Sequence, residues 1–142
     1  MSQEDKELLL KDICARLPYG VICTDNRHGD SRVFNVDAES KRVYYTDFDE
    51  CGLIENCKSY LRPMSSMTKE EKKELLDICS KETSLICEQL KNGDCGIENG
   101  KYHFNSIFEL DFVLFHHFDY RGLIEKGLAL EAPEDIYKTK LD

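Results

Sequence analysis

The chain has 142 residues, of which 41% are hydrophobic and 33% charged, so it carries enough apolar surface to fold as one domain. Its formal net charge of −9 repels phosphate backbones, which disfavours direct binding of nucleic acid. No apolar run approaches the roughly 20 residues that span a bilayer. We therefore expect a single globular domain over residues 1–142 that does not enter a membrane.

The seven cysteines are spread along the chain, and an odd number argues against a closed disulfide framework. The first ten residues lack the basic segment and the apolar core of a secretory signal peptide. We expect a cytoplasmic protein in which all seven thiols are reduced.

The first expected element is a helix between Ser2 and Pro18. The Ser2 side chain can accept a hydrogen bond from the backbone N–H of Asp5, and Pro18 cannot continue the helical hydrogen bonds. Apolar residues at helical spacing predict the buried face, which consists of Leu10, Ile13, Cys14 and Leu17.

Three short runs rich in β-branched and aromatic residues follow, at residues 20–24, 32–36 and 42–46. Turn-forming residues at 25–31 and 37–41 separate them. This pattern predicts a three-stranded antiparallel meander. A linker is expected after it, and this linker includes Cys51, Gly52 and residues 60–63.

A second, long helix is expected to begin at a capping box, in which Thr68 and Glu71 satisfy each other's backbone N–H groups. Asn92 and Gly93 form a suitable end for this helix. Its inner face is predicted to consist of Leu76, Cys79, Thr83, Ile86, Cys87 and Leu90.

A short hairpin and a third helix complete the expected elements. Asn99 and Gly100 are typical of a two-residue hairpin turn, here between residues 96–98 and 101–104. Ser106 and Glu109 can open the third helix. One apolar face of that helix consists of Ile107, Leu110, Val113, Leu114 and Phe118. Residues 131–142 are expected to form a loosely held tail.

A second apolar face on the third helix is formed by Phe108, Phe112 and Phe115. A helix that is apolar on two sides must be buried on both or lie at an interface. We therefore expect these three rings to form an interaction surface, covered either by residues 123–130 or by a second copy of the chain.

A candidate polar site follows the third helix and consists of His116, His117, Asp119, Tyr120 and Arg121. An imidazole oriented by a carboxylate can act as an acid or base near neutral pH. Adjacent helical residues point about 100° apart, however, so the two histidines do not converge on one metal or substrate. We expect His117 to pack at the helix end and His116 to face water.

The spacings of Cys and His residues lack the close pairs that are typical of structural zinc sites. Neither of the two common glycine-rich phosphate loops is present. We therefore predict no bound metal and no cofactor.

Three stretches, at residues 8–21, 60–71 and 117–133, together resemble a group of small uncharacterised proteins encoded by gut Bacteroidales and by their phages and mobile elements. No catalytic or binding residues come with this resemblance. It implies a small accessory protein in the bacterial cytoplasm.

Taken together, the sequence predicts an α+β fold, with about three helices packed on a small antiparallel sheet of four or five strands. We expect a non-enzymatic interaction module that binds a protein partner or a second copy of itself. The alternative is a small enzyme, or a binder of a nucleotide or other small molecule, with its site near residues 116–122.

Overall fold

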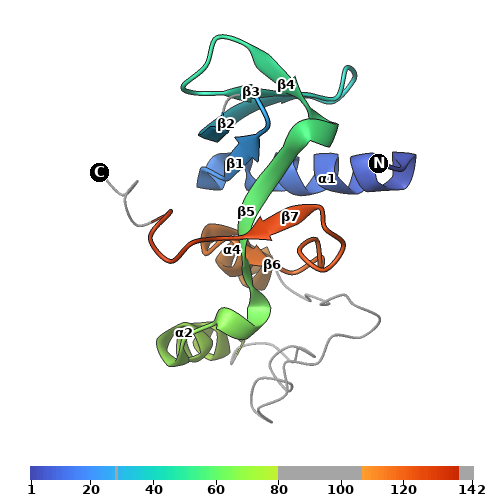
Figure 1. The fold of residues 1–142 in the computed structure, drawn as a ribbon. Coiled ribbons are helices and arrows are strands. Elements are labelled where there is room, and N and C mark those ends of the chain that lie inside the picture. Colours follow the sequence, from blue (N-terminus) through green and yellow to red (C-terminus); the bar gives the residue numbers. More distant parts are fainter. Residues whose placement is uncertain (28, 80–106, 138–142) are drawn as a thin grey trace. The chain divides into compact units, whose positions relative to one another are not determined.

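A computed structural model describes residues 1–27, 29–79 and 107–137 (Figure 1). In these residues there are three α-helices and a mixed set of seven strands. The expected α+β class is therefore confirmed, whereas the expected number of strands was too low. The chain divides into two compact units, which are described separately below: unit 1 contains Met1–Leu61 and Ile124–Asp142, and unit 2 contains Arg62–Leu123.

The sheet of unit 1 begins with four strands, each antiparallel to the next. They are β1 (Ile22–Asp25), β2 (Gly29–Asp37), β3 (Arg42–Tyr45) and β4 (Cys51–Leu53). The first three occupy the region of the expected meander, but β2 begins earlier than its apolar residues indicated. The turn between β1 and β2 is correspondingly shorter than the expected segment 25–31.

Strand β5 (Cys57–Pro63) follows the 3-10 turn η2 (Ile54–Asn56) and has neighbours on both sides in unit 1. Ser59 is paired with Cys23 of β1 in an antiparallel register and with Ala129 of β7 (Ala129–Glu131) in a parallel register. The expected linker was therefore wrong, because it contains β4 and β5. The strand has a weak sequence signal, since Lys58 and Ser59 interrupt its apolar residues.

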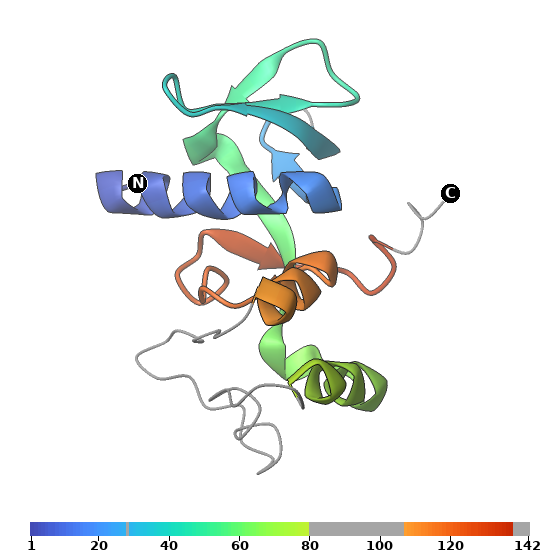
Figure 2. The ribbon, with the colours of Figure 1, turned by 180° about the vertical axis from the view of Figure 1, so that it is seen from behind.

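Helix α1 (Gln3–Arg16) crosses one face of this sheet, passing behind β5 in Figure 1 and in front of it in Figure 2. As expected, Ser2 Oγ accepts a hydrogen bond from the N–H of Asp5, at 3.1 Å. Pro18 lies in the 3-10 turn η1 (Leu17–Tyr19), which ends the helix.

The buried face of α1 differs from the expected one, because it includes two charged residues. Its members are Leu9, Asp12, Ile13 and Arg16, whereas Cys14 is exposed and Leu10 is half-buried. Arg16 Nε lies 2.8 Å from Asp12 Oδ2, and both side chains are inaccessible to solvent. The attraction between the two opposite charges offsets part of the free-energy cost of removing each from water, which allows both side chains to be buried.

The C-terminal residues 124–137 add to unit 1. The backbone N–H of Ala132 donates to the carbonyl of Leu61, which extends the contact of β7. The Tyr137 hydroxyl donates to the carbonyl of Tyr60 at 2.6 Å and accepts from the N–H of Ile22 at 3.1 Å. Both Ala132 and Tyr137 belong to the segment that the sequence predicts to be a tail.

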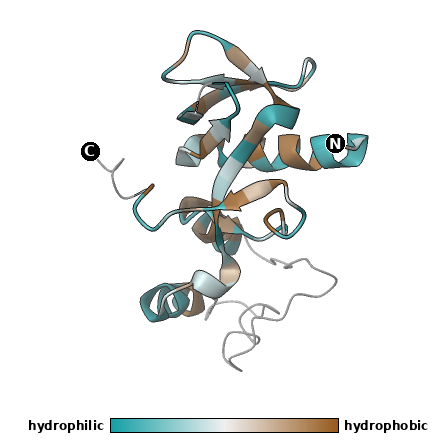
Figure 3. Ribbon diagram, viewed as in Figure 1, coloured by the Kyte–Doolittle hydropathy of each residue, from teal (hydrophilic) through white to brown (hydrophobic). Residues whose placement is uncertain are grey.

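Unit 2 contains the 3-10 turn η3 (Met64–Ser66) and the helices α2 (Lys69–Cys79) and α4 (Ile107–Phe115), which pack against each other. The capping box at the start of α2 is confirmed, with hydrogen bonds of 2.9 and 3.1 Å between Thr68 and Glu71. Strand β6 (Phe118–Asp119) pairs in parallel with residues 62–63. Figure 3 shows that α4 is largely hydrophobic and that α2 is largely hydrophilic.

Several expectations fall outside the described residues. They are the continuation of the second helix to Gly93, with Thr83, Ile86, Cys87 and Leu90 on its inner face, and the hairpin at residues 96–104. Within the described part of α2, the most buried apolar side chain is Leu75, and Leu76 is half-buried. Among the helices of the described residues, none has the length and apolar character needed to cross a membrane.

Candidate functional site

The nine residues of α4 have one buried side and one exposed side. Glu109, Phe112, Val113 and Leu114 are buried. Three large apolar side chains on the other side are exposed: Ile107 to 68%, Phe108 to 65% and Phe115 to 63%. The three phenylalanines of the expected interaction surface are thus placed differently, because Phe112 is only 7% exposed.

We use the name exposed α4 face for Ile107, Phe108, Asp111 and Phe115, all of which are exposed. Phe108 and Phe115 are seven residues apart, which is close to two helical turns, so they lie on one side of the helix. Asp111 lies between them along the same side. Exposed aromatic side chains grouped in this way are typical of surfaces that bind other proteins.

Next to the C-terminal end of α4, Arg62 and Glu71 form a close ion pair. The two guanidinium Nη atoms donate to the two carboxylate oxygens, at 2.6 and 2.7 Å. The same guanidinium lies 4.3 Å from the centre of the Phe118 ring, in cation–π geometry. Burial alone would raise the pKa of Glu71, but hydrogen bonds from Arg62 and from the Thr68 backbone lower it to about 2.

His116 connects this ion pair to α4. Its Nδ1 atom lies 3.2 Å from Glu71 Oε2. The centre of its ring lies 4.5 Å from the ring centre of Phe112 and 5.1 Å from that of Phe115. Burial lowers the pKa of His116, and the attraction of Glu71 opposes this effect only in part. At neutral pH the imidazole is therefore uncharged, and its environment is mainly aromatic.

The other residues of the expected polar site have structural contacts. The His117 side chain is buried, and its backbone adopts the left-handed conformation, with φ of 62°. The carbonyl of His117 accepts a hydrogen bond from the N–H of Arg62 at 2.8 Å. Asp119 Oδ1 accepts from the N–H of Leu123 at 2.9 Å. The Arg121 guanidinium lies over the ring of Tyr120, 4.8 Å from its centre.

Sequence reasoning missed Arg62 and Glu71 as partners of His116. It considered Asp119 as the orienting carboxylate because Asp119 is near in sequence, whereas the carboxylate in contact with the imidazole is Glu71. The capping-box pattern identified Glu71 only as a local helix residue. No sequence signal connects Glu71 with Arg62. The two residues meet because the turn η3 between β5 and α2 brings them together.

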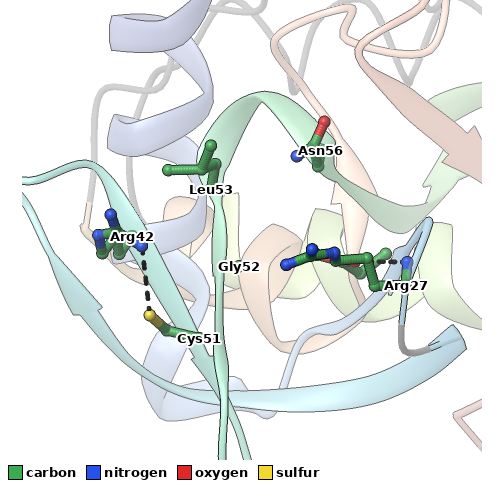
Figure 4. A pocket seen from close by; sticks show the side chains of 7 residues that line it. Arg27, Arg42, Cys51, Gly52, Leu53 and Asn56 are labelled. Atoms are coloured by element: carbon green, nitrogen blue, oxygen red, sulfur yellow. Dashed lines mark hydrogen bonds between the residues drawn. The ribbon is translucent and has the colours of Figure 1, made fainter.

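A second candidate site lies in unit 1, at the edge strand β4, and sequence reasoning did not indicate it. It is a pocket of about 400 Å³, lined by Asp25, Arg27, Arg42, Cys51, Gly52, Leu53 and Asn56. Figure 4 shows the Arg27 side chain reaching toward Gly52, with Arg42 and Cys51 on the other side of β4. Arg42 Nη1 lies 3.6 Å from Cys51 Sγ.

Asp25 forms the buried wall of this pocket. Its Oδ1 atom accepts from the backbone N–H of Arg27 at 2.8 Å, and its Oδ2 atom accepts from the Tyr45 hydroxyl at 3.2 Å. Burial, together with the neighbouring Cys57 and Asp25, raises the pKa of Tyr45, which keeps the phenol protonated as a donor. A Cβ atom at Gly52 would overlap Asp25 Oδ2, so any larger residue here must displace this carboxylate.

Cys14, Cys23, Cys51 and Cys57 are all free thiols. A hydrogen bond with Cys57 raises the pKa of Cys23, and burial adds to this effect. A buried, protonated thiol is a poor nucleophile and a poor metal ligand. In residues 1–27, 29–79 and 107–137 there is no group of three or more His, Cys, Asp or Glu side chains placed to hold a metal ion.

Comparison with known proteins assigns no family to the chain. No protein-family model matches it, and neither the curated proteins nor the solved structures contain a significant match.

Proposed function

We propose that this protein is a non-enzymatic interaction module that binds another protein through the exposed α4 face. The observation that carries the proposal is the exposure of Ile107, Phe108 and Phe115, each of which has more than 60% of its surface in contact with solvent. Burial of one such side chain contributes roughly 1.5–3 kcal/mol. Three of them on a single helix are sufficient for the central contact of a modest interface.

The end of α4 is fixed, which favours binding. His116 contacts Glu71, and the carbonyl of His117 accepts a hydrogen bond from the N–H of Arg62, so the last turn is attached to α2 and to the end of β5. A rigid surface loses little conformational entropy when a partner binds. The exposed α4 face is therefore presented in one orientation within unit 2.

Charge indicates the chemistry of the partner. The chain carries a net charge of −9, and Asp111 is exposed between Phe108 and Phe115. A second copy would bring two strongly acidic molecules together, whereas a partner with an apolar groove and a nearby Lys or Arg would be attracted. We therefore favour a partner with a basic surface over a homodimer.

The cellular setting is part of this proposal. The four free thiols named above agree with a reducing compartment, and the resemblance to proteins of gut Bacteroidales and their mobile elements suggests an accessory role in the bacterial cytoplasm. A basic bacterial protein is accordingly the partner for which we would search.

The experiment is photo-crosslinking in a Bacteroidales host, with a benzophenone amino acid placed at Phe108. The matched control places it at Phe34, which is also exposed, to 58%, but lies on β2 in unit 1. A protein crosslinked from position 108 and not from position 34 would be purified and its affinity for the chain measured by calorimetry. We expect the double variant F108S/F115S to weaken this binding at least tenfold, F34S to leave it unchanged, and D111K to weaken it.

Equal binding by F108S/F115S and the wild type would contradict the proposed surface. Sedimentation velocity tests the favoured type of partner, because a dimer that is dissociated by F108S/F115S would replace the basic partner with a second copy.

The alternative of an acid–base site near residues 116–122 is supported by one observation, the contact of His116 with Glu71. The carboxylate, however, is already engaged by Arg62 and by the N–H of Thr68. This arrangement holds Glu71 as a structural anion, so we place the alternative second.

A further inference from the structure

The pocket at β4 differs in character from the rest of this acidic chain. Of the charged groups that line it, Arg27 and Arg42 are exposed, whereas Asp25 is only 4% exposed. The pocket volume of about 400 Å³ lies within the range of sites that bind small molecules, roughly 300–1,000 Å³. The groups that a ligand would meet first are therefore two guanidinium groups.

The Asp25 carboxylate accepts hydrogen bonds from groups of the protein itself. One of its oxygens receives the N–H of Arg27, and the other receives the hydroxyl of Tyr45. The first of these bonds forms an Asx turn, which fixes the backbone that carries Arg27 beside the pocket. Asp25 is thus a positioning residue that orders the turn after β1.

The two guanidinium groups have no carboxylate partner at ion-pair distance in the described chain. Asp37 is the cross-strand neighbour of Arg42, and attraction by Arg42 contributes in a minor way to its lowered pKa. Arg42 also contacts the thiol of Cys51, a weak acceptor. Donor capacity for an oxyanion is therefore available on both sides of β4.

We propose that this pocket binds a small molecule carrying an oxyanion, either a carboxylate or a phosphate, with the anionic group held by Arg27 beside Gly52, while Arg42 on the other side of β4 adds to the positive charge at the pocket. Asn56 supplies an amide to the polar part of the ligand, and Leu53 contacts its apolar part. The limited volume fits a compact metabolite. This site lies in unit 1, whereas the exposed α4 face belongs to unit 2.

The test uses the full chain labelled with ¹⁵N and titrated with succinate, glycerol phosphate and inorganic phosphate, with ionic strength held constant by sodium chloride. We expect saturable shifts of the amide signals of residues 25–27, 42 and 51–56. The variant R27Q/R42Q should weaken binding roughly tenfold or more. The control K11Q/K58Q removes the same charge from exposed positions elsewhere in unit 1 and should bind like the wild type.

The arms of the titration distinguish the two sources of the oxyanion. Saturation by succinate alone identifies a carboxylate site, and saturation by the phosphate compounds alone identifies a phosphate site; both outcomes support the proposal. N56L, which retains both charges, should also weaken binding and serves as a second variant. The proposal is overturned if no probe saturates, or if R27Q/R42Q and K11Q/K58Q change the affinity equally.

Discussion

Arg62 and Glu71 are joined by two hydrogen bonds between the guanidinium and both carboxylate oxygens. The same carboxylate receives the N–H of Thr68 and lies beside the imidazole of His116. One acidic side chain therefore connects the end of β5, the start of α2 and the end of α4. Its removal should weaken the attachment of these three elements to one another.

The variant E71Q should be destabilised in a way that depends on pH. The pKa of Glu71 falls from an ordinary 4.5 to about 2 on folding, so its contribution to stability is fully present above about pH 4.5 and is lost as the pH falls toward 2. Because the pair is partly solvated, we expect a loss of about 1–2 kcal/mol at pH 7. Urea unfolding of E71Q and wild type between pH 3 and 7 should show the difference shrinking at low pH.

The control for this measurement is E55Q, which removes the partly exposed pair between Lys6 and Glu55. It should change the free energy of unfolding by less than about 0.5 kcal/mol. A deficit of E71Q that is equal at pH 3 and pH 7 would show that the charge of Glu71 is unimportant.

The buried pair of Asp12 and Arg16 leads to a second prediction. D12A leaves the Arg16 charge buried beside a cavity and should cost about 3–5 kcal/mol. The double variant D12L/R16M replaces both charges with apolar side chains and should regain most of this loss. Thermal unfolding of the wild type, D12A and D12L/R16M measures these differences. A double variant less stable than D12A would contradict the prediction.

Thiol reactivity should divide the cysteines of unit 1 into two classes. Cys14 is exposed and Cys51 is half-buried, so both should be alkylated in the native protein. Cys23 and Cys57 are inaccessible, and the pKa of Cys23 is raised, so both should react only after unfolding. Peptide mapping after alkylation without reductant measures this directly, and a disulfide between any two of the four would contradict the structure.

The two sides of α4 should respond differently to substitution. F112A removes a buried ring and should cost about 3–5 kcal/mol, whereas F108S changes an exposed one and should cost less than about 0.5 kcal/mol. Denaturant unfolding of each variant provides the comparison. Equal destabilisation by both would mean that Phe108 is covered in solution.

The close approach of Gly52 to Asp25 gives a fifth prediction. In G52A the new methyl group displaces a carboxylate that is held by Tyr45 and by the Arg27 backbone, at a cost of about 1–3 kcal/mol. The amide signal of Arg27 should shift as its hydrogen bond is lost. In the control G127A the methyl group meets open space, so only the strain of its positive φ remains, about 1 kcal/mol, and Arg27 should be unaffected.

The local elements could be predicted because the residues that define them lie close together in the sequence. Ser2 and Asp5 define the start of α1, and Thr68 and Glu71 define the start of α2; in each case the hydrogen bond joins residues three apart. The strands β1 to β3 are likewise joined in chain order, so alternating β-branched and aromatic runs were sufficient to locate them.

The candidate sites could not be predicted because their residues meet only through tertiary structure. Glu71 and His116 are distant in sequence, and the positions of Arg27 and Arg42 depend on the register of three strands. The buried face of α1 was missed for a related reason. An apolar pattern cannot show that Asp12 and Arg16 neutralise each other inside the protein.

The parallel pairing of β5 with β7 bears on how the protein is made. During synthesis β5 leaves the ribosome well before β7, because residues 64–128 lie between them. During that interval the backbone groups of residues 59–61 that face β7 have no strand to bind, and an open sheet edge is a template for aggregation. Chaperone demand during translation should therefore be set by the delayed arrival of Ala129–Glu131.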